Sequence, residues 1–339
     1  MELRDRISAF VTLGSELKKH VNSENDSKLH SIINEQSIKN SWFAPENVKF
    51  ALNAIADSLT AESINRWLSK YPELSNATAP KTIGVIMAGN IPLVGFHDFL
   101  CILITGNKIL AKTSSKDSEL IVHISKMLSE INREFSELIS FTQDTFSGFD
   151  AIIATGSNNT SRYFEYYFGK YPNIIRKNRN SVAIINGNES DFELEELGRD
   201  IFSYFGLGCR NVSKIYIPTG YDLANLINHW SAYADIVYNN KYANNYDYNK
   251  AIFLVNKEKF MDTGYLLLRE ASGIPSPISV LHYEYYNSNA DIRTNIEKQK
   301  SSIQCIVSQN DVPFGKSQNP HLWDYADEID TINFLLKIK

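Results

Sequence analysis

The feature that most constrains the fold is an alternation of short apolar runs and helical stretches that begins near Lys81. Residues 83–87 and 108–112 predict strands, and residues 93–104 between them predict an apolar helix closed by Gly106. The pattern continues with a helix over 118–131, a strand ending at Thr155, a helix over 159–169 and a strand over 181–185. Because repeated βα units need right-handed crossovers, this order predicts an α/β protein with a parallel sheet covered by helices on both faces. Such sheets bind ligands at the carboxyl ends of their strands, so a nucleotide-binding domain is expected.

A second stretch, Tyr204 to Asn211, places one cysteine between a helix end and a strand start. Ser190 and Glu193 have the spacing of a capping box, which predicts a helix that ends before the cysteine. Residues 213–218 alternate polar and apolar side chains and predict a strand. Cys209 is therefore expected on a glycine-containing connection, where its thiol can be reached. This stretch alone is consistent both with a nucleophile and with a small buried hydrophobic residue.

The composition is that of a globular protein. A chain of 339 residues with 43% hydrophobic side chains is long enough for about two domains. A net charge of -5 and a pI near 5.9 argue against a nucleic-acid partner. Three widely spaced cysteines, and seven histidines without a His-x-x-x-His pair, predict neither a disulfide framework nor a metal site. Since no secretory leader and no apolar stretch approaching about 18 residues is recognisable, we expect a cytoplasmic protein without a membrane span.

Four regions are expected along the chain. They are a helical N-terminal region over 1–80, a nucleotide-binding domain over 81–205, a smaller α/β catalytic domain over 206–316 and a closing segment over 317–339. Pro45 suits the first position of a helix because its φ is fixed near the helical value. Residues 239–248 are dense in Asn and Tyr and predict an exposed, ordered loop. Further strands are predicted over 251–255, 278–283 and 329–336.

Three turns that follow predicted strands carry small and polar residues. They are Met87-Ala88-Gly89-Asn90-Ile91-Pro92, Ala111-Lys112-Thr113-Ser114-Ser115-Lys116 and Ala154-Thr155-Gly156-Ser157-Asn158-Asn159. Each precedes a predicted helix and could offer backbone amides and hydroxyls to a phosphate. An ordinary helix cap explains each turn taken alone. The usual Gly-x-Gly-x-x-Gly fingerprint is absent from this region.

Taken in order, these motifs resemble the aldehyde dehydrogenase superfamily and, within it, the LuxC-type fatty-acyl-CoA reductases. The superfamily is suggested by Met87 to Leu93, Leu110 to Ser115, Thr155-Gly156-Ser157 and Gly206-Leu207-Gly208-Cys209. The subfamily is suggested by Gly95-Phe96-His97-Asp98-Phe99, Arg162-Tyr163-Phe164-Glu165-Tyr166-Tyr167, the segment from Tyr204 to Lys214, and Asp324-Tyr325-Ala326-Asp327. These motifs cover about residues 81 to 336, and no motif covers the first 80 residues. The expected fold is that of aldehyde dehydrogenases.

The resemblance implies an enzyme that uses NADPH to reduce an acyl thioester to a fatty aldehyde. Cys209 would attack the acyl group, while the Asn90 side chain and the Cys209 backbone N–H would stabilise the oxyanion. The implied cofactor-binding residues are Ala88, Lys112, Ser114, Ser115, Thr155, Gly156, Ser157 and Glu270. NAD-preferring relatives often carry Glu where this chain has Ser115. A carboxylate there would repel a 2′-phosphate, so Lys112, Ser115 and Lys116 favour NADPH.

One departure from the superfamily concerns the base. Ordinary aldehyde dehydrogenases carry a Glu-Leu-Gly-Gly stretch whose Glu activates the water that hydrolyses the thioester. The corresponding residues here, 175–181, contain no carboxylate. Loss of that base suits acyl transfer to or from a thiol, which needs little help near neutral pH. The implied partners are acyl-CoA or another acyl thioester, an acyl-activating or acyl-transferring protein, and further copies of the chain in a homo-oligomer.

Two other classes of protein stay open. A cysteine acyltransferase or thioesterase would use Cys209 without a cofactor, and the polar βα turns would then have no purpose. An inactive structural subunit of a fatty-acid reductase complex would not need both Asn90 and Cys209. Cys101 and Cys305 lie in apolar runs and are expected to pack in the core.

Overall fold

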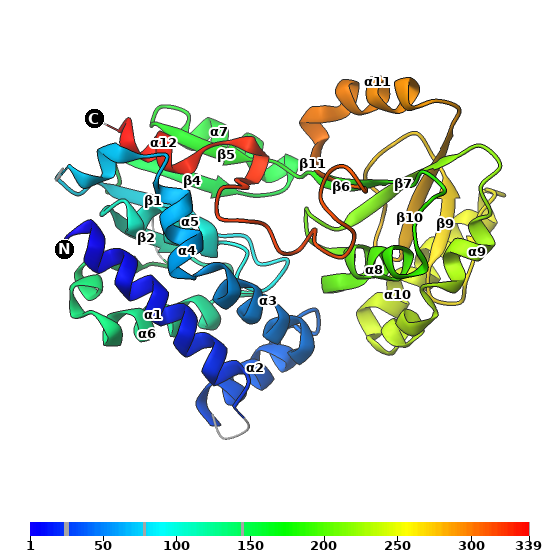
Figure 1. Ribbon diagram of the computed structural model, residues 1–339. Helices are drawn as coiled ribbons and strands as arrows, with labels where there is room; N and C mark the ends of the chain where they lie inside the picture. Colours follow the sequence, from blue (N-terminus) through cyan, green and yellow to red (C-terminus); the bar gives the residue numbers. More distant parts are fainter. Residues whose placement is uncertain (24–26, 77–78, 144–145, 339) are drawn as a thin grey trace. The chain divides into compact units, whose positions relative to one another are not determined.

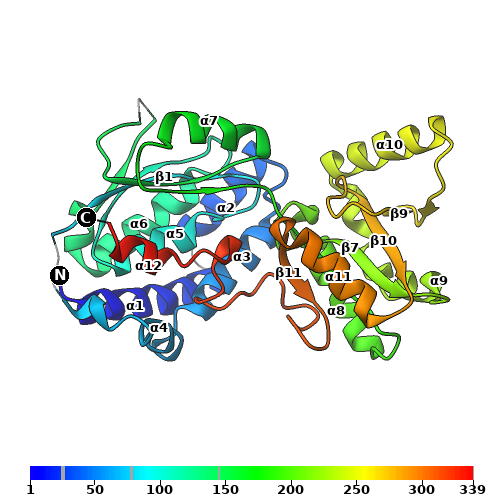
Figure 2. The ribbon, with the colours of Figure 1, turned by 90° about the horizontal axis from the view of Figure 1, so that it is seen from above.

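The computed structural model describes residues 1–23, 27–76, 79–143 and 146–338 and divides the chain into two compact units (Figure 1). The first unit comprises Met1–Asn178 with His321–Lys339, and the second comprises Arg179–Pro320. Each unit contains one sheet with its own helices (Figure 2). The predicted α/β class with a parallel nucleotide-type sheet is confirmed.

The sheet of the first unit is entirely parallel. Its strands are β1 (Thr82–Ile86), β2 (Lys108–Lys112), β3 (Ile139–Phe141), β4 (Ala151–Thr155) and β5 (Asn173–Arg176), in the order β3-β2-β1-β4-β5. The central strands β1 and β4 are apolar apart from one terminal threonine each, because both faces of the sheet are covered, and residues 151–154 are all fully buried. The strand order reverses at β1, between β2 and β4.

Helices cover both faces of this sheet. They are α5 (Phe96–Ile104), α6 (Glu119–Ile131) and α7 (Asn158–Phe168), together with α12 (Thr331–Leu336) from the end of the chain. Helix α5 is buried at every position except His97, because α1 and α12 pack on it in addition to the sheet. The closing segment thus contributes to the core of the first unit.

The N-terminal region is helical, as the sequence indicates. Its helices are α1 (Leu3–Val21), α2 (Ser27–Lys39), α3 (Pro45–Ser58) and α4 (Ala61–Leu68). Pro45 occupies the first turn of α3, as predicted. Phe10 and Leu13 of α1 belong to the same buried cluster as Ile83 of β1 and Phe99 of α5. The helical region and the sheet therefore share one core.

The sheet of the second unit has six strands. They are β6 (Asn180–Ile184), β7 (Val212–Pro218), β8 (Met261–Asp262), β9 (Leu267–Glu270), β10 (Val280–Tyr286) and β11 (Ile303–Val307), in the order β11-β6-β7-β10-β9-β8. All pairs are parallel except β8 with β9. The helices are α8 (Asp191–Phe202), α9 (Leu223–Asn228), α10 (Asn240–Val255) and α11 (Asn289–Gln299).

Side chains of β7 alternate between two cores. Ile215 and Ile217 pack with Leu197 of α8 on one face of the sheet. Tyr216 packs with Ile292 of α11 on the other face. Both faces are thus buried, so β7 carries few polar side chains, and Ser213 and Lys214 among them have hydrogen-bond partners.

The structure differs from the sequence prediction at one domain boundary. The boundary was predicted between residues 205 and 206, whereas the two units divide between Asn178 and Arg179. The physical reason is that β6 pairs with β7 and β11 of the second sheet and not with the first. Strand β6 and helix α8 consequently belong to the unit that carries Cys209.

Three predicted elements have the wrong type. Residues 239–248, predicted as a loop, and 251–255, predicted as a strand, form the single helix α10. Asn239 caps this helix, and its buried side chains recur with helical spacing at Tyr242, Tyr246, Asn249 and Phe253. The strand predicted over 329–336 is the helix α12, capped by Asp330 and buried through Ile332 and Leu335.

Candidate active site

The carboxyl edge of the first sheet collects the predicted cofactor residues of this unit. Strand β1 pairs with β2 on one side and β4 on the other, so the turns after these three strands meet at the point where the strand order reverses. The residues placed there are Ala88, Lys112, Ser114, Ser115, Thr155, Gly156 and Ser157. Asn90, an exposed residue, lies on the turn after β1.

The turns after β1 and β2 touch each other. The backbone N–H of Met87 donates to the Lys112 carbonyl at 3.0 Å. A Cβ at Gly89 would lie 2.4 Å from the Ser114 Oγ, so only glycine fits this close approach. Ser114 in turn accepts a hydrogen bond from the Lys116 N–H at 3.2 Å. The predicted oxyanion turn and the predicted nucleotide segment are therefore in direct contact.

The side chains of the second turn suit a phosphate. Ser115 and Lys116 are exposed, Lys112 is half-buried, and the first carboxylate after Lys112, on Asp117, is buried. No negative charge is therefore presented to solvent between Lys112 and Asp117. These residues fit the NADPH interpretation, because an exposed carboxylate there would repel a 2′-phosphate.

Ser157 has a structural role. Its Oγ accepts a hydrogen bond from the Thr160 N–H at 3.2 Å and caps α7. A Cβ at Gly156 would lie 2.9 Å from the Phe164 ring, so this glycine permits close packing of α7 on the strand end. The hydroxyl of Ser157 is thus engaged by the helix, while Thr155 and Gly156 are half-buried at the edge of the sheet.

Cys209 lies in the second unit, half-buried, on the connection between α8 and β7. The predicted capping box of Ser190 and Glu193 starts α8. After α8 the backbone has φ values of 52° at Tyr204, 59° at Phe205 and 76° at Gly206. Two bulky residues in the left-handed region are costly, at about 1–3 kcal/mol each, and persist only where the surroundings impose them.

Asn211 supplies that constraint. Its Oδ1 accepts the Gly208 N–H at 2.8 Å, and its Nδ2 donates to the carbonyls of Asp200 at 3.1 Å and Ser203 at 2.8 Å. One buried side chain therefore ties the loop before Cys209 to the last turn of α8. The sequence contained Asn211 within a recognised motif, but its role was not predicted because the bonds are to backbone atoms.

Cys305 lies next to the Cys209 loop. The Ser181 Oγ is 3.1 Å from the Cys209 carbonyl and 3.0 Å from the Cys305 Sγ. Because the single hydroxyl proton of Ser181 goes to the carbonyl, the Cys305 thiol donates to Ser181. Burial raises the pKa of Cys305, with Arg210 acting in the opposite direction, so the thiol form is favoured. Cys305 is half-buried, and the expectation that it serves only as core packing was wrong.

Cys101 is fully buried in α5, as expected. Its Sγ is 3.8 Å from the Nδ1 of His97, whose Nε2 lies 2.9 Å from the Leu322 carbonyl. Burial is the main cause of a raised pKa at Cys101, and the nearby Asp98 carboxylate adds to it. This cysteine has the environment of an inert thiol.

Glu270 is exposed at the end of β9, and the turn that follows it is firmly held. Three buried side chains donate hydrogen bonds to the backbone carbonyls of this turn. Lys214 Nζ donates to Ser272 at 2.7 Å, His282 Nδ1 to Gly273 at 2.9 Å, and Ser213 Oγ to Ile274 at 2.9 Å. Lys214 also pairs with Glu284. Since a carbonyl only accepts, Nδ1 of His282 carries the proton. Burial lowers the pKa of His282 and so favours the neutral ring.

In residues 175–181, the stretch that lacks the superfamily Glu, two basic side chains form ion pairs. Arg176 is buried and forms an ion pair with Asp98, and its Nη2 donates to the Thr331 hydroxyl at 3.1 Å. Lys177 pairs with Glu165 at 2.9 Å. Arg176 thus ties the edge strand β5 to α5 and to the closing segment, and offers no base to a reaction.

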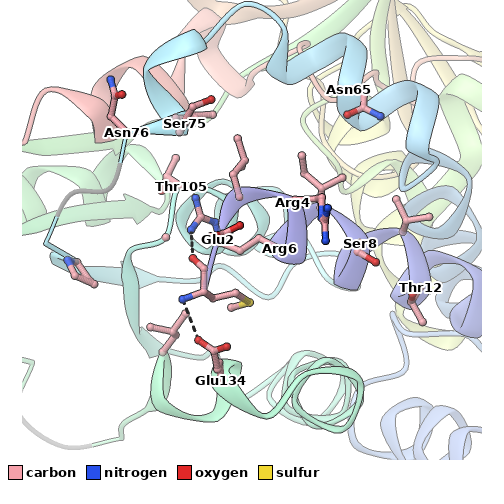
Figure 3. A pocket seen from close by; sticks show the side chains of 18 of the residues that line it. Glu2, Arg4, Arg6, Ser8, Thr12, Asn65, Ser75, Asn76, Thr105 and Glu134 are labelled. Atoms are coloured by element: carbon pink, nitrogen blue, oxygen red, sulfur yellow. Dashed lines mark hydrogen bonds and ion pairs between the residues drawn. The ribbon is translucent and has the colours of Figure 1, made fainter.

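A cavity of about 1300 Å³ lies in the first unit, at the opposite end of the sheet from the predicted cofactor turns. It borders the amino ends of β2 and β3, at Lys108 and Leu138, whereas the predicted sites border the carboxyl ends. At its border the Arg6 guanidinium donates to the Met1 carbonyl at 2.7 Å, and the Met1 amino group pairs with Glu134 at 2.9 Å. Figure 3 marks both interactions with dashed lines. Its size alone does not connect it with the chemistry of Cys209.

Within the described ranges, no helix is both long and apolar enough to cross a bilayer. The same part of the chain holds no group of three or more His, Cys, Asp or Glu side chains arranged to bind a metal ion.

The two sheets and their connections are those of aldehyde dehydrogenases. A succinate complex of aldehyde dehydrogenase 21 from Physcomitrella patens matches 98% of this chain and 79% of its own, with 12% identity and a TM-score of 0.67. An NAD⁺ complex of the Bacillus cereus enzyme matches with a TM-score of 0.62 and 12% identity over 91% of this chain and 72% of its own. A complex of glyceraldehyde-3-phosphate dehydrogenase from Methanocaldococcus jannaschii with NADP matches 91% of this chain and 76% of its own. Its sequence identity is 11% and its TM-score is 0.63.

Sequence comparison assigns the chain to one family within this fold. A family model described as acyl-CoA reductase (LuxC) matches residues 17–224, more than half of the chain, and the protein therefore belongs to that family. The predicted resemblance is confirmed. A long-chain acyl-protein thioester reductase from Aliivibrio fischeri is 27% identical over 207 residues, which are 55% of this chain and 42% of the relative. The match thus spans less than half of that relative's length.

Proposed function

We propose that this protein uses NADPH to reduce an acyl thioester, either acyl-CoA or an acyl-protein, to a fatty aldehyde through an acyl-enzyme on Cys209. The observation that carries the proposal is the constrained loop of Cys209, with its left-handed backbone at Tyr204 and Phe205 and its anchor at Asn211. Membership of the LuxC family and the NADP and NAD⁺ complexes of structural relatives support it.

The chemistry assigned to Cys209 has two stages. Its thiolate attacks the thioester carbonyl, the bond to the carrier sulfur breaks, and the carrier leaves as a thiolate that takes up a proton. When bound, the nicotinamide supplies a hydride to the acyl-enzyme carbonyl. The C–S bond of the resulting thiohemiacetal alkoxide then breaks, which releases the aldehyde and returns Cys209 to its thiolate. In this proposal Asn90 and the Cys209 N–H donate to the oxyanion that forms at each stage.

The cofactor is assigned to the carboxyl edge of the first sheet. Lys112, Ser115 and Lys116 would contact the adenosine 2′-phosphate, while Ala88, Ser114, Thr155, Gly156 and Ser157 would line the rest of the edge. Glu270 would contact the nicotinamide ribose from the turn held by Lys214. On this assignment residues 81–178 form the NADP-binding domain, and the second unit is the catalytic domain.

Partners and location are further parts of the proposal. An acyl-activating or acyl-transferring protein would deliver the acyl group, and the chain would act in the cytoplasm as a homo-oligomer. A cofactor-independent acyltransferase or thioesterase and an inactive structural subunit are the alternatives. Neither accounts for the exposed, phosphate-suited turn at Ser115 and Lys116.

The test is NADPH oxidation with a panel of acyl-CoAs and acyl-proteins of increasing chain length, with aldehyde measured as product. We expect one oxidation per aldehyde and no turnover in Cys209→Ala. Thioester cleavage that proceeds without NADPH would favour the acyltransferase or thioesterase. A protein that neither oxidises NADPH nor becomes acylated would favour the structural subunit.

A further inference from the structure

Asp117 joins the two turns that the proposed function assigns to the oxyanion and the cofactor. Its Oδ2 accepts the backbone N–H of Leu93 at 2.7 Å. Leu93 closes the turn that carries Asn90 and has a φ of 58°, in the left-handed region that leucine rarely adopts. Asp117 itself lies on the segment after β2, with its N–H on the Ser114 carbonyl at 3.1 Å.

The carboxyl group is enclosed. Asp117 is 5% exposed, and its Oδ1 is buried without a hydrogen-bond partner among the described residues. The void beside it is lined by apolar or glycine positions, Met87, Ala88, Leu93, Gly95, Phe96 and Ile121, and has no room for a water molecule. Burying a carboxyl with one amide partner costs free energy, and the bond to the Leu93 amide is what offsets part of that cost.

We propose that Asp117 is a positioning residue that holds the Asn90 turn in its working conformation through the Leu93 amide and so couples that turn to the cofactor segment. The inference rests on the proposed function, because the role of Asn90 does. Asp117 acts through Leu93: releasing this amide lets leucine leave the left-handed region, and Asn90, three residues earlier, moves with the turn.

Among the described residues, no charged side chain of the surrounding elements pairs with the Asp117 carboxyl. On the same segment, Lys112 is half-buried and Lys116 is exposed. On α6, Glu119 pairs with Lys39. On α5, Asp98 pairs with Arg176, and His97 contacts the Leu322 carbonyl.

Burial consequently dominates the acidity of Asp117. It raises the pKa of this carboxyl to about 7, with the Leu93 amide acting in the opposite direction. Ionisation as the pH rises through 7 strengthens the bond to Leu93, because an N–H bonds a carboxylate more strongly than a neutral carboxyl. The coupling should therefore be strongest above neutral pH.

The test compares Asp117→Ala and Asp117→Asn with the single variant Asn90→Ala and with the double variant Asp117→Ala/Asn90→Ala. We expect Asp117→Ala to lower kcat by up to about 10²-fold, as for a misplaced catalytic group. The double variant should lose no more than Asn90→Ala alone, because both remove the same contribution. Asp117→Asn keeps an oxygen acceptor and should retain most of kcat, but without the rise near pH 7. Effects that multiply in the double variant, or an unchanged pH profile in Asp117→Asn, would overturn the proposal.

Hydrogen exchange at the Leu93 amide gives a readout that is independent of reductase activity. We expect Asp117→Ala to accelerate exchange at Leu93, and Asp117→Asn to leave it near the wild-type rate. Unchanged protection in Asp117→Ala would contradict the positioning role even if the enzyme is active. If the wild type shows no reductase activity but Leu93 behaves as expected, the proposed function fails and the coupling stands.

Asp150→Ala is a matched control. The Asp150 Oδ2 accepts the Thr82 N–H at 2.7 Å, as Asp117 accepts the Leu93 N–H, but Asp150 is exposed and lies at the amino end of β1. Removing it should leave kcat and its pH profile as in the wild type. A loss in Asp150→Ala equal to that in Asp117→Ala would show that any backbone-bonded Asp of this unit matters equally, and would overturn the specific role.

Discussion

The three cysteines differ in their surroundings, and this difference predicts how much reductase activity is lost when each is replaced. Cys209 is on a constrained loop, Cys101 is enclosed in α5, and Cys305 donates its thiol proton toward Ser181. We expect Cys209→Ala to abolish reduction while Cys101→Ala leaves most of it. The measurement is NADPH oxidation with acyl-CoA after circular dichroism has shown that each variant is folded. Equal losses in both variants would contradict the assignment of Cys209.

Cys305→Ala is expected to have a reductase activity between those of Cys209→Ala and Cys101→Ala. It removes the thiol donor to Ser181 and leaves the Cys305 backbone N–H as a donor, while the Ser181 hydroxyl still donates to the Cys209 carbonyl. The loss of one such bond costs about 1 kcal/mol, or roughly a fivefold effect on rate. Cys305→Ser restores a donor and should restore the rate. If Cys305→Ser is as slow as Cys305→Ala, the hydrogen bond is not what matters at this position.

Lys112 carries the prediction about cofactor choice. Lys112→Ala should weaken NADPH binding by about ten- to a hundredfold, the range for a bond to a charged group, and NADH binding much less. The contrast should shrink at high salt, because a half-exposed contact is screened. Fluorescence titration with NADPH and with NADH at two ionic strengths measures this difference in affinity. An unchanged preference would remove the 2′-phosphate role, and Lys108→Ala, at the opposite end of β2, is the control.

At the scale of elements, the connection from α8 to β7 depends on one side chain. Asn211→Ala leaves the Gly208 N–H and the Asp200 and Ser203 carbonyls unpaired in a buried place, at about 1–3 kcal/mol for each group left unsatisfied. We expect slower acylation of Cys209 together with reduced stability. The measurements are the rate of adduct formation with labelled acyl-CoA and urea unfolding.

Asn249→Ala separates the two effects. Asn249 is equally an almost fully buried amide, donating to the Asn245 and Ile278 carbonyls at 2.9 and 3.0 Å, but in α10. It should lose stability while the folded fraction still acylates Cys209 at the wild-type rate. A comparable acylation defect in Asn249→Ala would mean that Asn211 acts only through global stability.

Helices and strands were predicted correctly from the sequence where their residues follow a local periodic pattern. The βα order after Lys81 and the capping box at Ser190 are local patterns, and both are present in the structure. Helix α10 was missed because its Asn and Tyr side chains read as a polar loop, although Tyr242 and Phe253 are buried on one face. The short helix α12 was read as a strand because six residues hold too few turns to show a period.

The candidate site was predictable only where side chains carry the chemistry. Asn90 and Lys112 were singled out by residue type and by the strand ends that precede them, and Cys209 by its place between a helix end and a strand start. Asp117 and Asn211 were not, since their bonds are to backbone groups brought together by turns whose left-handed residues have no sequence signature. The position of Cys305 depends on β11 pairing with β6, more than a hundred residues apart in the chain, which no local pattern encodes.

At the scale of the whole molecule, the missing base predicts which acceptors the acyl-enzyme can use. Residues 175–181 contain no carboxylate, and Arg176 is committed to Asp98. Water should therefore be a poor acceptor and a thiol a good one. Incubation with radiolabelled acyl-CoA without NADPH should give an adduct that survives in buffer and is discharged by NADPH or by free CoA.

The nature and reversibility of that adduct complete the test. Hydroxylamine should cleave it, as expected of a thioester, and Cys209→Ala should form none. In the reverse direction, aldehyde should be oxidised with NADP⁺ only when CoA is present, because release of the acyl group needs a thiol to attack the Cys209 thioester. Rapid hydrolysis of the adduct in buffer, or free acid formed from aldehyde without CoA, would show that another residue supplies the base and that water is a natural acceptor of this enzyme.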